Sequence, residues 1–358
     1  MTQERKQWEG LRARRDCAAK ARKMKIDSIA KRCLCFMLVS AAALAAVSCG
    51  GLKIRLGTPP EEPLKEFTVE GKERGKVLVI PVTGFLSDAP GKGLLERRPS
   101  MVQEVVSQLR RAEKDGEIRA VVLEINSPGG SITASDILYR ELMDFKEHTK
   151  VPMVAALMDV AASGAYYLAL SADRIVAHPT TITGSVGVIL VKPKVMGLME
   201  KLGLAVEVDK SGREKDIGSP FRASTTEEQK IFRDLVAQLG GRFLSLVATR
   251  RKISSEDLQK ISSARIYLAQ EALHLKLIDD IGYLKDAVAE AKRLAALPKD
   301  AKVVVYRRTT FPNDNLYNTS AASYLGPAPS LIDLNLPEIM PPLTPGFYYL
   351  WLPGTGDN

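Results

Sequence analysis

Two junctions, each between an apolar β-prone run and a turn of small residues, constrain this chain most. The run at 151–158 leads into Ala-Ala-Ser163-Gly, and the run at 120–125 leads into Asn-Ser-Pro-Gly-Gly130. A strand–turn–helix junction can hold a hydroxyl beside the unpaired amides of a helix N-terminus, where a developing oxyanion is stabilised. Either junction alone is also typical of an ordinary strand end. Together they indicate a nucleophile, Ser163, and a second group of exposed backbone N–H donors.

Apolar runs alternate with helical patterns along most of the chain. Short apolar strands are predicted at 76–84, 119–125, 151–158, 174–177 and 302–306. Helices are predicted at 100–114, 133–147, 163–171, 225–251 and 283–295. Strands separated by helices form parallel sheets with crossover connections, so the sequence predicts an α/β domain over residues 76–310. We expect a polar spacer at 53–75, a further strand at 205–208 and a Pro-rich tail at 311–358.

The positive charge of the chain is concentrated in a basic leader, residues 1–32. This leader holds 11 Lys and Arg against 4 Asp and Glu, which leaves only +2 of the total charge of +9 for all other residues. The distribution therefore does not indicate a nucleic-acid partner. Residues 33–52 carry no charge and are just long enough to span a bilayer. We expect this segment to place the chain at a membrane, with the basic flank on the cytoplasmic side.

Two interpretations of the hydrophobic segment remain open. Ala-Val-Ser-Cys49 looks like a bacterial lipobox, which makes Cys49 a candidate for lipidation, and a start at Met24 would give an ordinary signal peptide. Without cleavage, the segment would be a signal anchor. Both place the α/β domain outside the cytoplasm, tethered in a bacterial cell envelope. All four cysteines lie within residues 17–49, so the domain has no disulfide and no cysteine-based metal site.

A seryl nucleophile needs a base that accepts its proton. The histidines of the domain are His148, His178 and His274, and their contexts are typical of surface or structural residues. A desolvated, neutral lysine is the alternative base, and Lys215 lies in a loop marked by glycines. From these residues alone, the identity of the base stays open.

Four ordered motifs resemble the signal peptide peptidase A (protease IV) family in its short, single-repeat bacterial form. They are Asn126-Ser-Pro-Gly-Gly130, Ala161-Ala-Ser163-Gly, Thr183-Gly-Ser185-Val-Gly-Val and Ser211-Gly-Arg-Glu-Lys215-Asp-Ile. The resemblance implies an α/β fold of the Clp/crotonase-type ββα superhelix, with Ser163 as nucleophile and Lys215 as base. It also implies that Ser185 orients the lysine and that the amides of Gly130 and Gly164 form the oxyanion hole.

The function that this resemblance implies is a membrane-tethered serine endopeptidase with a Ser/Lys dyad. Its substrates would be hydrophobic peptides, notably remnant signal peptides, with misfolded membrane or secreted proteins as further candidates. The family forms homo-oligomeric rings, and we expect neither a cofactor nor a metal. A crotonase-type acyl-CoA enzyme fits poorly with the secretory leader. A non-catalytic scaffold fits poorly with the presence of both Ser163 and Lys215.

The end of the tail is unusually apolar. Residues 343–353 are bounded by prolines and are not expected to remain exposed. They could cap their own domain, dock across a subunit interface or occupy a substrate groove. Apolar runs at 121–125, 153–158 and 186–191 predict a substrate pocket for small or apolar side chains.

Overall fold

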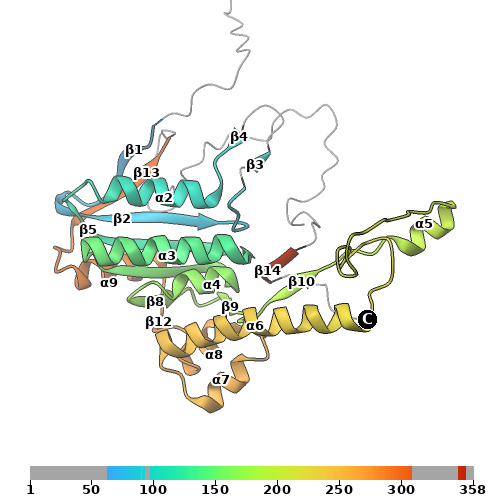
Figure 1. Ribbon diagram of the computed structural model, residues 1–358. Helices are drawn as coiled ribbons and strands as arrows, with labels where there is room; N and C mark the ends of the chain where they lie inside the picture. Colours follow the sequence, from blue (N-terminus) through green and yellow to red (C-terminus); the bar gives the residue numbers. More distant parts are fainter. Residues whose placement is uncertain (1–62, 90, 93–96, 309–345, 352–358) are drawn as a thin grey trace, which may run out of the picture. The chain divides into compact units, whose positions relative to one another are not determined.

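A mostly parallel sheet of nine strands organises the part of the chain that the computed structural model describes, residues 63–89, 91–92, 97–308 and 346–351 (Figure 1). The main order is β1-β13-β2-β5-β7-β8-β12, and β9 pairs with the far end of β7 while β11 pairs with β9. The strands are β1 (Lys65–Glu70), β2 (Glu73–Thr83), β5 (Ile118–Ser127), β7 (Met153–Ala162), β8 (Arg174–Ala177), β9 (Ile182–Gly184), β11 (Ile266–Leu268), β12 (Asp280–Ile281) and β13 (Ala301–Arg307).

Helices cover both faces of this sheet. In the described part of the chain, the helices outside the arm described below are α2 (Met101–Ala112), α3 (Ile132–Thr149), α4 (Gly164–Ala169), α6 (Thr226–Arg251), α7 (Ser255–Ile261), α8 (Ala269–His274) and α9 (Leu284–Leu294). Strand β5 shows why the sheet is buried on both sides: Val121, Leu123 and Ile125 join the core under α2, α3 and α4, whereas Ala120 and Val122 join the core under α9. Such two-sided burial accounts for the near-continuous apolar runs of the sequence.

Two smaller sheets lie outside the main one. The pair β3 (Gly91–Lys92) and β4 (Arg97–Arg98) is antiparallel. The other small sheet has the order β10-β14-β6, and its strands are β6 (Gly129–Ser131), β10 (Ile189–Val191) and β14 (Gly346–Leu350). Strand β6 directly follows β5, so this small sheet grows from the glycine turn that the sequence singled out.

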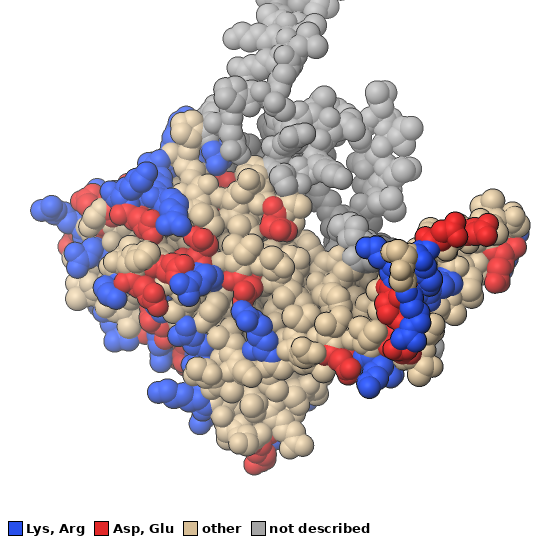
Figure 2. Space-filling view, viewed as in Figure 1, with Lys and Arg blue, Asp and Glu red and all other residues tan. Residues whose placement is uncertain are grey.

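Residues 192–224, called the arm below, connect β10 to the long helix α6 (Thr226–Arg251) and carry the short helix α5 (Met196–Leu202). Figure 1 shows the arm beyond the end of the main sheet. Several large apolar side chains of the arm are exposed, including Leu202 at 63%. In Figure 2, basic and acidic side chains are interspersed on the sheet-and-helix part and on the arm, with uncharged surface between them.

The structure differs from the predicted boundaries at three places. Residues 65–75, predicted as spacer, contain β1 and the start of β2, and β1 pairs antiparallel with β13. Residues 205–208, predicted as a strand, have no regular structure, and both valines there are about half exposed. The tail contributes β14 to the domain.

Candidate active site

Ser163 lies between the end of β7 and the start of α4, in a backbone conformation that is unusual for a residue with a side chain. Its φ is 54° and its ψ is −117°. Its N–H donates to the Gly184 carbonyl at 2.8 Å, and its carbonyl accepts the Tyr167 N–H at 2.9 Å. Ser163 is 1% exposed, and its Oγ has no hydrogen-bond partner within the described residues. A strained turn that carries a hydroxyl without a hydrogen-bond partner is typical of a nucleophile.

The two glycines predicted to form the oxyanion hole lie side by side. A Cβ placed on Gly164 would lie 3.3 Å from the Gly130 amide nitrogen and would overlap the Ser135 hydroxyl. A Cβ on Gly129 would lie 2.8 Å from the Gly164 amide nitrogen, and Gly129 has a φ of +102°. Side chains are therefore excluded at these glycines by space and, at Gly129, also by backbone conformation, so a small acceptor such as a carbonyl can approach the amides of Gly130 and Gly164.

Ser185 lies next to the same turn. It follows Gly184, whose carbonyl accepts the Ser163 N–H, and its own N–H donates to the Arg265 carbonyl at 2.9 Å. Its φ is 51° and it is 8% exposed. The structure thus brings Ser163, Ser185, Gly130 and Gly164 together at the ends of β7, β9 and β6.

Lys215 is placed elsewhere, in the arm. It is exposed, and its side chain makes no hydrogen bond or ion pair with any described residue. The Ser163 Oγ also lacks a partner among these residues, so the predicted pair of Ser163 and Lys215 is not hydrogen-bonded in the described part of the chain.

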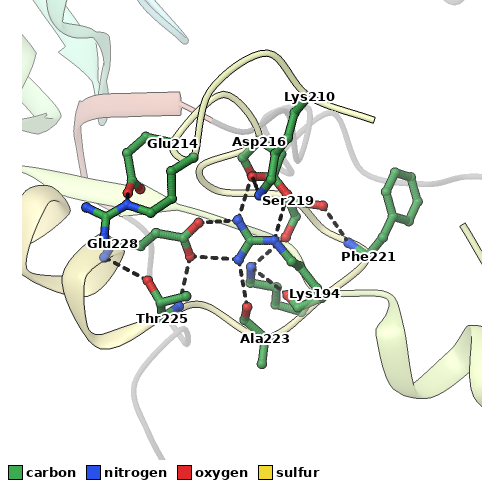
Figure 3. A network of polar contacts seen from close by, with 11 residues as sticks. Lys194, Lys210, Glu214, Asp216, Ser219, Phe221, Ala223, Thr225 and Glu228 are labelled. Carbon is green, nitrogen blue, oxygen red and sulfur yellow. Dashed lines mark hydrogen bonds and ion pairs between the residues drawn. The ribbon is translucent and has the colours of Figure 1, made fainter. Parts of the chain in front are cut away.

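The loop that carries Lys215 is held by a network of charges (Figure 3). Arg222 donates from Nε to Asp216 at 2.8 Å, and its other nitrogens bind both carboxylate oxygens of Glu228. Lys210 donates to the other Asp216 oxygen at 2.7 Å. The hydrogen bonds from Arg222 and Lys210 hold the pKa of the Asp216 carboxyl well below its usual range. Asp216 therefore stays ionised and anchors the loop beside Lys215.

Two of the three histidines of the domain have other partners. His178 Nδ1 contacts Thr180 Oγ1 at 2.8 Å, and its ring packs edge-on against Tyr283. His274 Nδ1 contacts the Gln270 carbonyl at 2.8 Å. None of them is hydrogen-bonded to the Ser163 hydroxyl in the part of the chain that the structure describes.

Sequence reasoning did not place β14 at this site. The strand runs antiparallel between β6 and β10, with Tyr349 opposite Gly130. The side chain of Tyr349 is fully buried between aromatic rings of α4 and α6, and burial raises its pKa to about 12. The apolar, Pro-bounded composition of residues 343–353 was the only signal for such docking, and it did not specify the partner strand.

The described residues contain no cluster of His, Cys, Asp and Glu that could hold a metal ion. Within the same ranges, no helix is long and apolar enough to cross a membrane. The predicted leader and hydrophobic segment, residues 1–52, and the lipidation candidate Cys49 lie outside the described residues.

The chain is similar to known peptidases. The family model of peptidase family S49 matches residues 145–298, and that of Clp protease matches residues 96–182. A relative from Enterococcus faecium that carries the name signal peptide peptidase SppA is 34% identical over 70% of this chain and 72% of its own. Protease 4 of Salmonella typhi is 31% identical over 74% of this chain and 41% of its own. The chloroplastic serine protease SPPA of Arabidopsis thaliana is 30% identical over 67% of this chain and 34% of its own.

Among solved structures, a ClpP1 mutant of Listeria monocytogenes covers 59% of this chain at 17% identity, with a TM-score of 0.38. The match to the Clp protease family confirms the Clp-type α/β fold that the sequence motifs predicted.

Proposed function

Because the chain belongs to peptidase family S49, the signal peptide peptidase A family, and is a serine peptidase, we propose that it is a Ser/Lys endopeptidase that hydrolyses hydrophobic peptides, notably remnant signal peptides. The observation that carries this proposal is the geometry at Ser163. A buried hydroxyl without a partner in the described residues follows a positive-φ turn and adjoins two glycine amides. Such a site binds a peptide carbonyl and attacks it.

Each site residue has a distinct role in this mechanism. The Ser163 Oγ attacks the peptide carbonyl, while the amides of Gly130 and Gly164 stabilise the oxyanion. Lys215 accepts the seryl proton and returns it to the leaving amine, and Ser185 orients the lysine. Water then hydrolyses the acyl-enzyme on Ser163. The proposal needs no cofactor and no metal.

Two routes can bring Lys215 to Ser163. The arm of the same chain can close over the site, or the arm of a neighbouring subunit in a homo-oligomeric ring can supply the lysine. The exposed apolar side chains of the arm support the second route, since a subunit interface would bury them. A chain whose Ser163 is paired with a neighbour's lysine is inactive alone and complete only in the ring.

Mixed oligomers distinguish the two routes. Ser163→Ala and Lys215→Ala variants are each expected to be inactive. If the lysine comes from a neighbour, random mixing of the two variants should restore about a quarter of wild-type activity, because half of the subunits keep the serine and half of their neighbours keep the lysine. If the dyad closes within one chain, the mixture should stay inactive.

Labelling tests the proposed function itself. The purified full chain is treated with a peptidyl fluorophosphonate, and the modified residue is mapped by mass spectrometry. We expect modification of Ser163 and hydrolysis of peptides derived from signal-peptide hydrophobic regions. Absence of both labelling and hydrolysis, or labelling of another serine, would exclude this assignment.

The location of the enzyme is a further part of the proposal. The basic leader and the uncharged segment 33–52 support membrane tethering in a bacterial cell envelope, with the peptidase domain outside the cytoplasm. The mass of the N-terminus after extraction from membranes tests this. A lipidated Cys49 or an intact N-terminus in the membrane fraction agrees with tethering, whereas an unmodified chain found only in the soluble fraction contradicts it.

A further inference from the structure

A groove runs between helices α3 and α6, and Tyr167 of α4 lies at its base (Figure 1). Its volume is about 660 Å³, which is within the range of sites that bind small organic ligands. None of the proposed catalytic residues lines this α3–α6 groove, so the proposed mechanism gives it no role. Its lining includes Asp136 and Tyr139 of α3, Tyr167 of α4, and Arg242, Leu246 and Arg250 of α6.

One end of the α3–α6 groove holds a charge pair. The Tyr167 hydroxyl and an Arg242 nitrogen both donate to the same oxygen of Asp136, each at 2.7 Å. Burial alone would raise the pKa of the Asp136 carboxyl, but the hydrogen bonds from Arg242 and Tyr167 hold this pKa below its usual range. Asp136 is therefore ionised at neutral pH, and its negative charge offsets the positive charge of Arg242.

The charge of Arg250, at the other end, is not offset in this way. Its Nε donates to the Tyr139 hydroxyl at 2.8 Å, and a terminal nitrogen contacts the Met143 sulfur at 3.2 Å. No carboxylate of the described residues forms an ion pair with Arg250, and Asp144, which follows Met143, is bound by Arg140 at 2.8 Å. The remaining N–H groups of the Arg250 guanidinium can therefore bind an anion from outside the chain.

The surface between the two arginines is apolar. Arg242 and Arg250 are eight residues apart on α6, which corresponds to about 12 Å along a helix axis. Leu246 lies midway between them and is partly buried. On the opposite wall, the ring of Tyr139 packs edge-on against that of Tyr167, with centroids 5.3 Å apart. The α3–α6 groove thus offers an apolar strip that ends at a guanidinium without a carboxylate partner in the described residues.

This combination fits an organic carboxylate better than an inorganic anion. A phosphate group carries about two charges at neutral pH, which one guanidinium does not neutralise. A carboxylate carries a single charge and matches the fork of a guanidinium with two parallel hydrogen bonds. An apolar body attached to the carboxylate would cover Leu246 and Tyr139 and remove their apolar surface from water. The C-terminal end of an apolar peptide has both parts.

We infer that the α3–α6 groove binds the C-terminal end of an apolar peptide, with the carboxylate on Arg250 and the terminal side chains along Leu246 and Tyr139. The choice of a peptide rests on the proposed function, because a serine peptidase that acts on hydrophobic peptides releases apolar fragments that end in a new carboxylate. The groove is therefore a second peptide site on the enzyme, one that takes cleaved products rather than the bond to be cleaved.

The α3–α6 groove is close to the nucleophile but separate from it. Tyr167, at its base, donates its N–H to the Ser163 carbonyl at 2.9 Å and its hydroxyl to Asp136. A peptide in the groove accordingly lies against the helix that begins after Ser163, while its binding does not require the serine hydroxyl. Binding can therefore be measured on the full chain of Ser163→Ala, which does not hydrolyse the peptide.

Calorimetric titration compares N-acetyl-leucyl-phenylalanine, which has a free carboxylate, with its C-terminal amide. We expect Ser163→Ala to bind the acid at least about tenfold more tightly than the amide, because charge-assisted hydrogen bonds to Arg250 are made only by the acid. Adding Arg250→Gln should reduce this preference to within about twofold. Adding Lys252→Gln is the matched control: it removes a positive charge from the same end of α6, outside the groove, and should leave the preference unchanged.

Several results would overturn the inference. Equal binding of acid and amide, or a preference for the acid that survives Arg250→Gln, would show that Arg250 does not hold the carboxylate. An equal loss with Lys252→Gln would show that only the net charge matters. Displacement of the acid by inorganic phosphate at an equal concentration would show a general anion site instead of a peptide site.

Labelling of the wild type with the fluorophosphonate separates this inference from the proposed function. A chain that is labelled at Ser163 and hydrolyses peptides, yet shows no preference for the acid in its Ser163→Ala form, overturns the inference and leaves the proposed function standing. A chain that binds the acid through Arg250, yet is neither labelled nor hydrolytic, overturns the proposed function alone.

Discussion

Replacing Ser163 by alanine should stabilise the protein while it removes the nucleophile. Ser163 is 1% exposed, and its Oγ has no hydrogen-bond partner in the described part of the chain. Leaving a buried hydroxyl unpaired costs about 1–3 kcal/mol. The void left by a single oxygen atom costs less, because cavity terms scale with the volume removed. We therefore expect Ser163→Ala to raise the free energy of unfolding by about 1–2 kcal/mol.

The backbone at Ser163 supplies a second comparison. Its φ of 54° and ψ of −117° are a conformation that glycine adopts more easily than serine or alanine. Strain of this kind costs about 1–3 kcal/mol. Ser163→Gly would relieve this strain. Glycine, however, has more conformational freedom in the unfolded chain, and the loss of that freedom on folding offsets about 0.5–1 kcal/mol of the gain in stability. Ser163→Gly should accordingly be at least as stable as Ser163→Ala.

Lys215→Ala is the matched reference for both variants. We expect this variant to be inactive as well, and replacement of an exposed lysine changes stability by only about 0.5 kcal/mol. Thermal unfolding measures the difference. For a domain of this size, each kcal/mol moves the Tm by about 2–4 °C, so Ser163→Ala should melt about 2–8 °C above Lys215→Ala. An equal or lower Tm would refute the claim that the serine hydroxyl is unpaired in the folded protein.

Three further outcomes are expected. Asp115→Asn should lower the Tm at pH 7 but not in acid. Burial alone would raise the pKa of the Asp115 carboxyl, but hydrogen bonds from Lys76 and a backbone amide hold this pKa below its usual range. The stabilisation is present above the unfolded pKa of about 3.9 and is lost as the pH falls through the lower folded pKa, which melting curves in a pH series measure. Arg222→Lys should lower kcat at least about tenfold with little change in Tm, whereas Arg213→Lys in the same arm should stay within about twofold, since Arg222 bridges the largely buried carboxylates of Asp216 and Glu228 and both ion pairs of Arg213 are exposed. Equal rates would contradict this. Lys215→Arg should be as inactive as Lys215→Ala in peptidase assays, because a guanidinium stays charged, and an active Arg variant would exclude Lys215 as the base.

Local patterns in the sequence predicted the elements that build the site. Helix α6 was predicted at 225–251 and spans Thr226–Arg251. In the structure it begins after Thr225, because Thr225 and Glu228 form a capping box within four residues. The turn at Ser163 was recognisable because small residues directly follow an apolar strand. These signals come from residues that are close in the sequence, so they can be recognised without knowledge of the fold.

Elements at the edges of the fold could not be predicted from local sequence in this way. Strand β1 was predicted to be part of a spacer because residues 53–75 are polar and rich in Pro, Glu and Lys, and only its pairing with β13 makes it part of the sheet. The valines at 206 and 208 looked like a strand, but no strand of the described residues lies beside them, and they are exposed. Whether such a segment forms a strand depends on an adjacent strand with which it can pair rather than on its own residues.

Residue order and motif predicted Ser163 as nucleophile, Lys215 as base and the amides of Gly130 and Gly164 as the oxyanion hole. They did not predict the position of β14. The pairing of Tyr349 with Gly130 joins residues from opposite ends of the domain through backbone hydrogen bonds, which every residue except proline can form and which therefore leave no mark in the sequence. The tertiary structure alone decides that this tyrosine lies among the rings of α4 and α6, with its carbonyl oxygen close to Gly164, and that Lys215 lies on a separate arm.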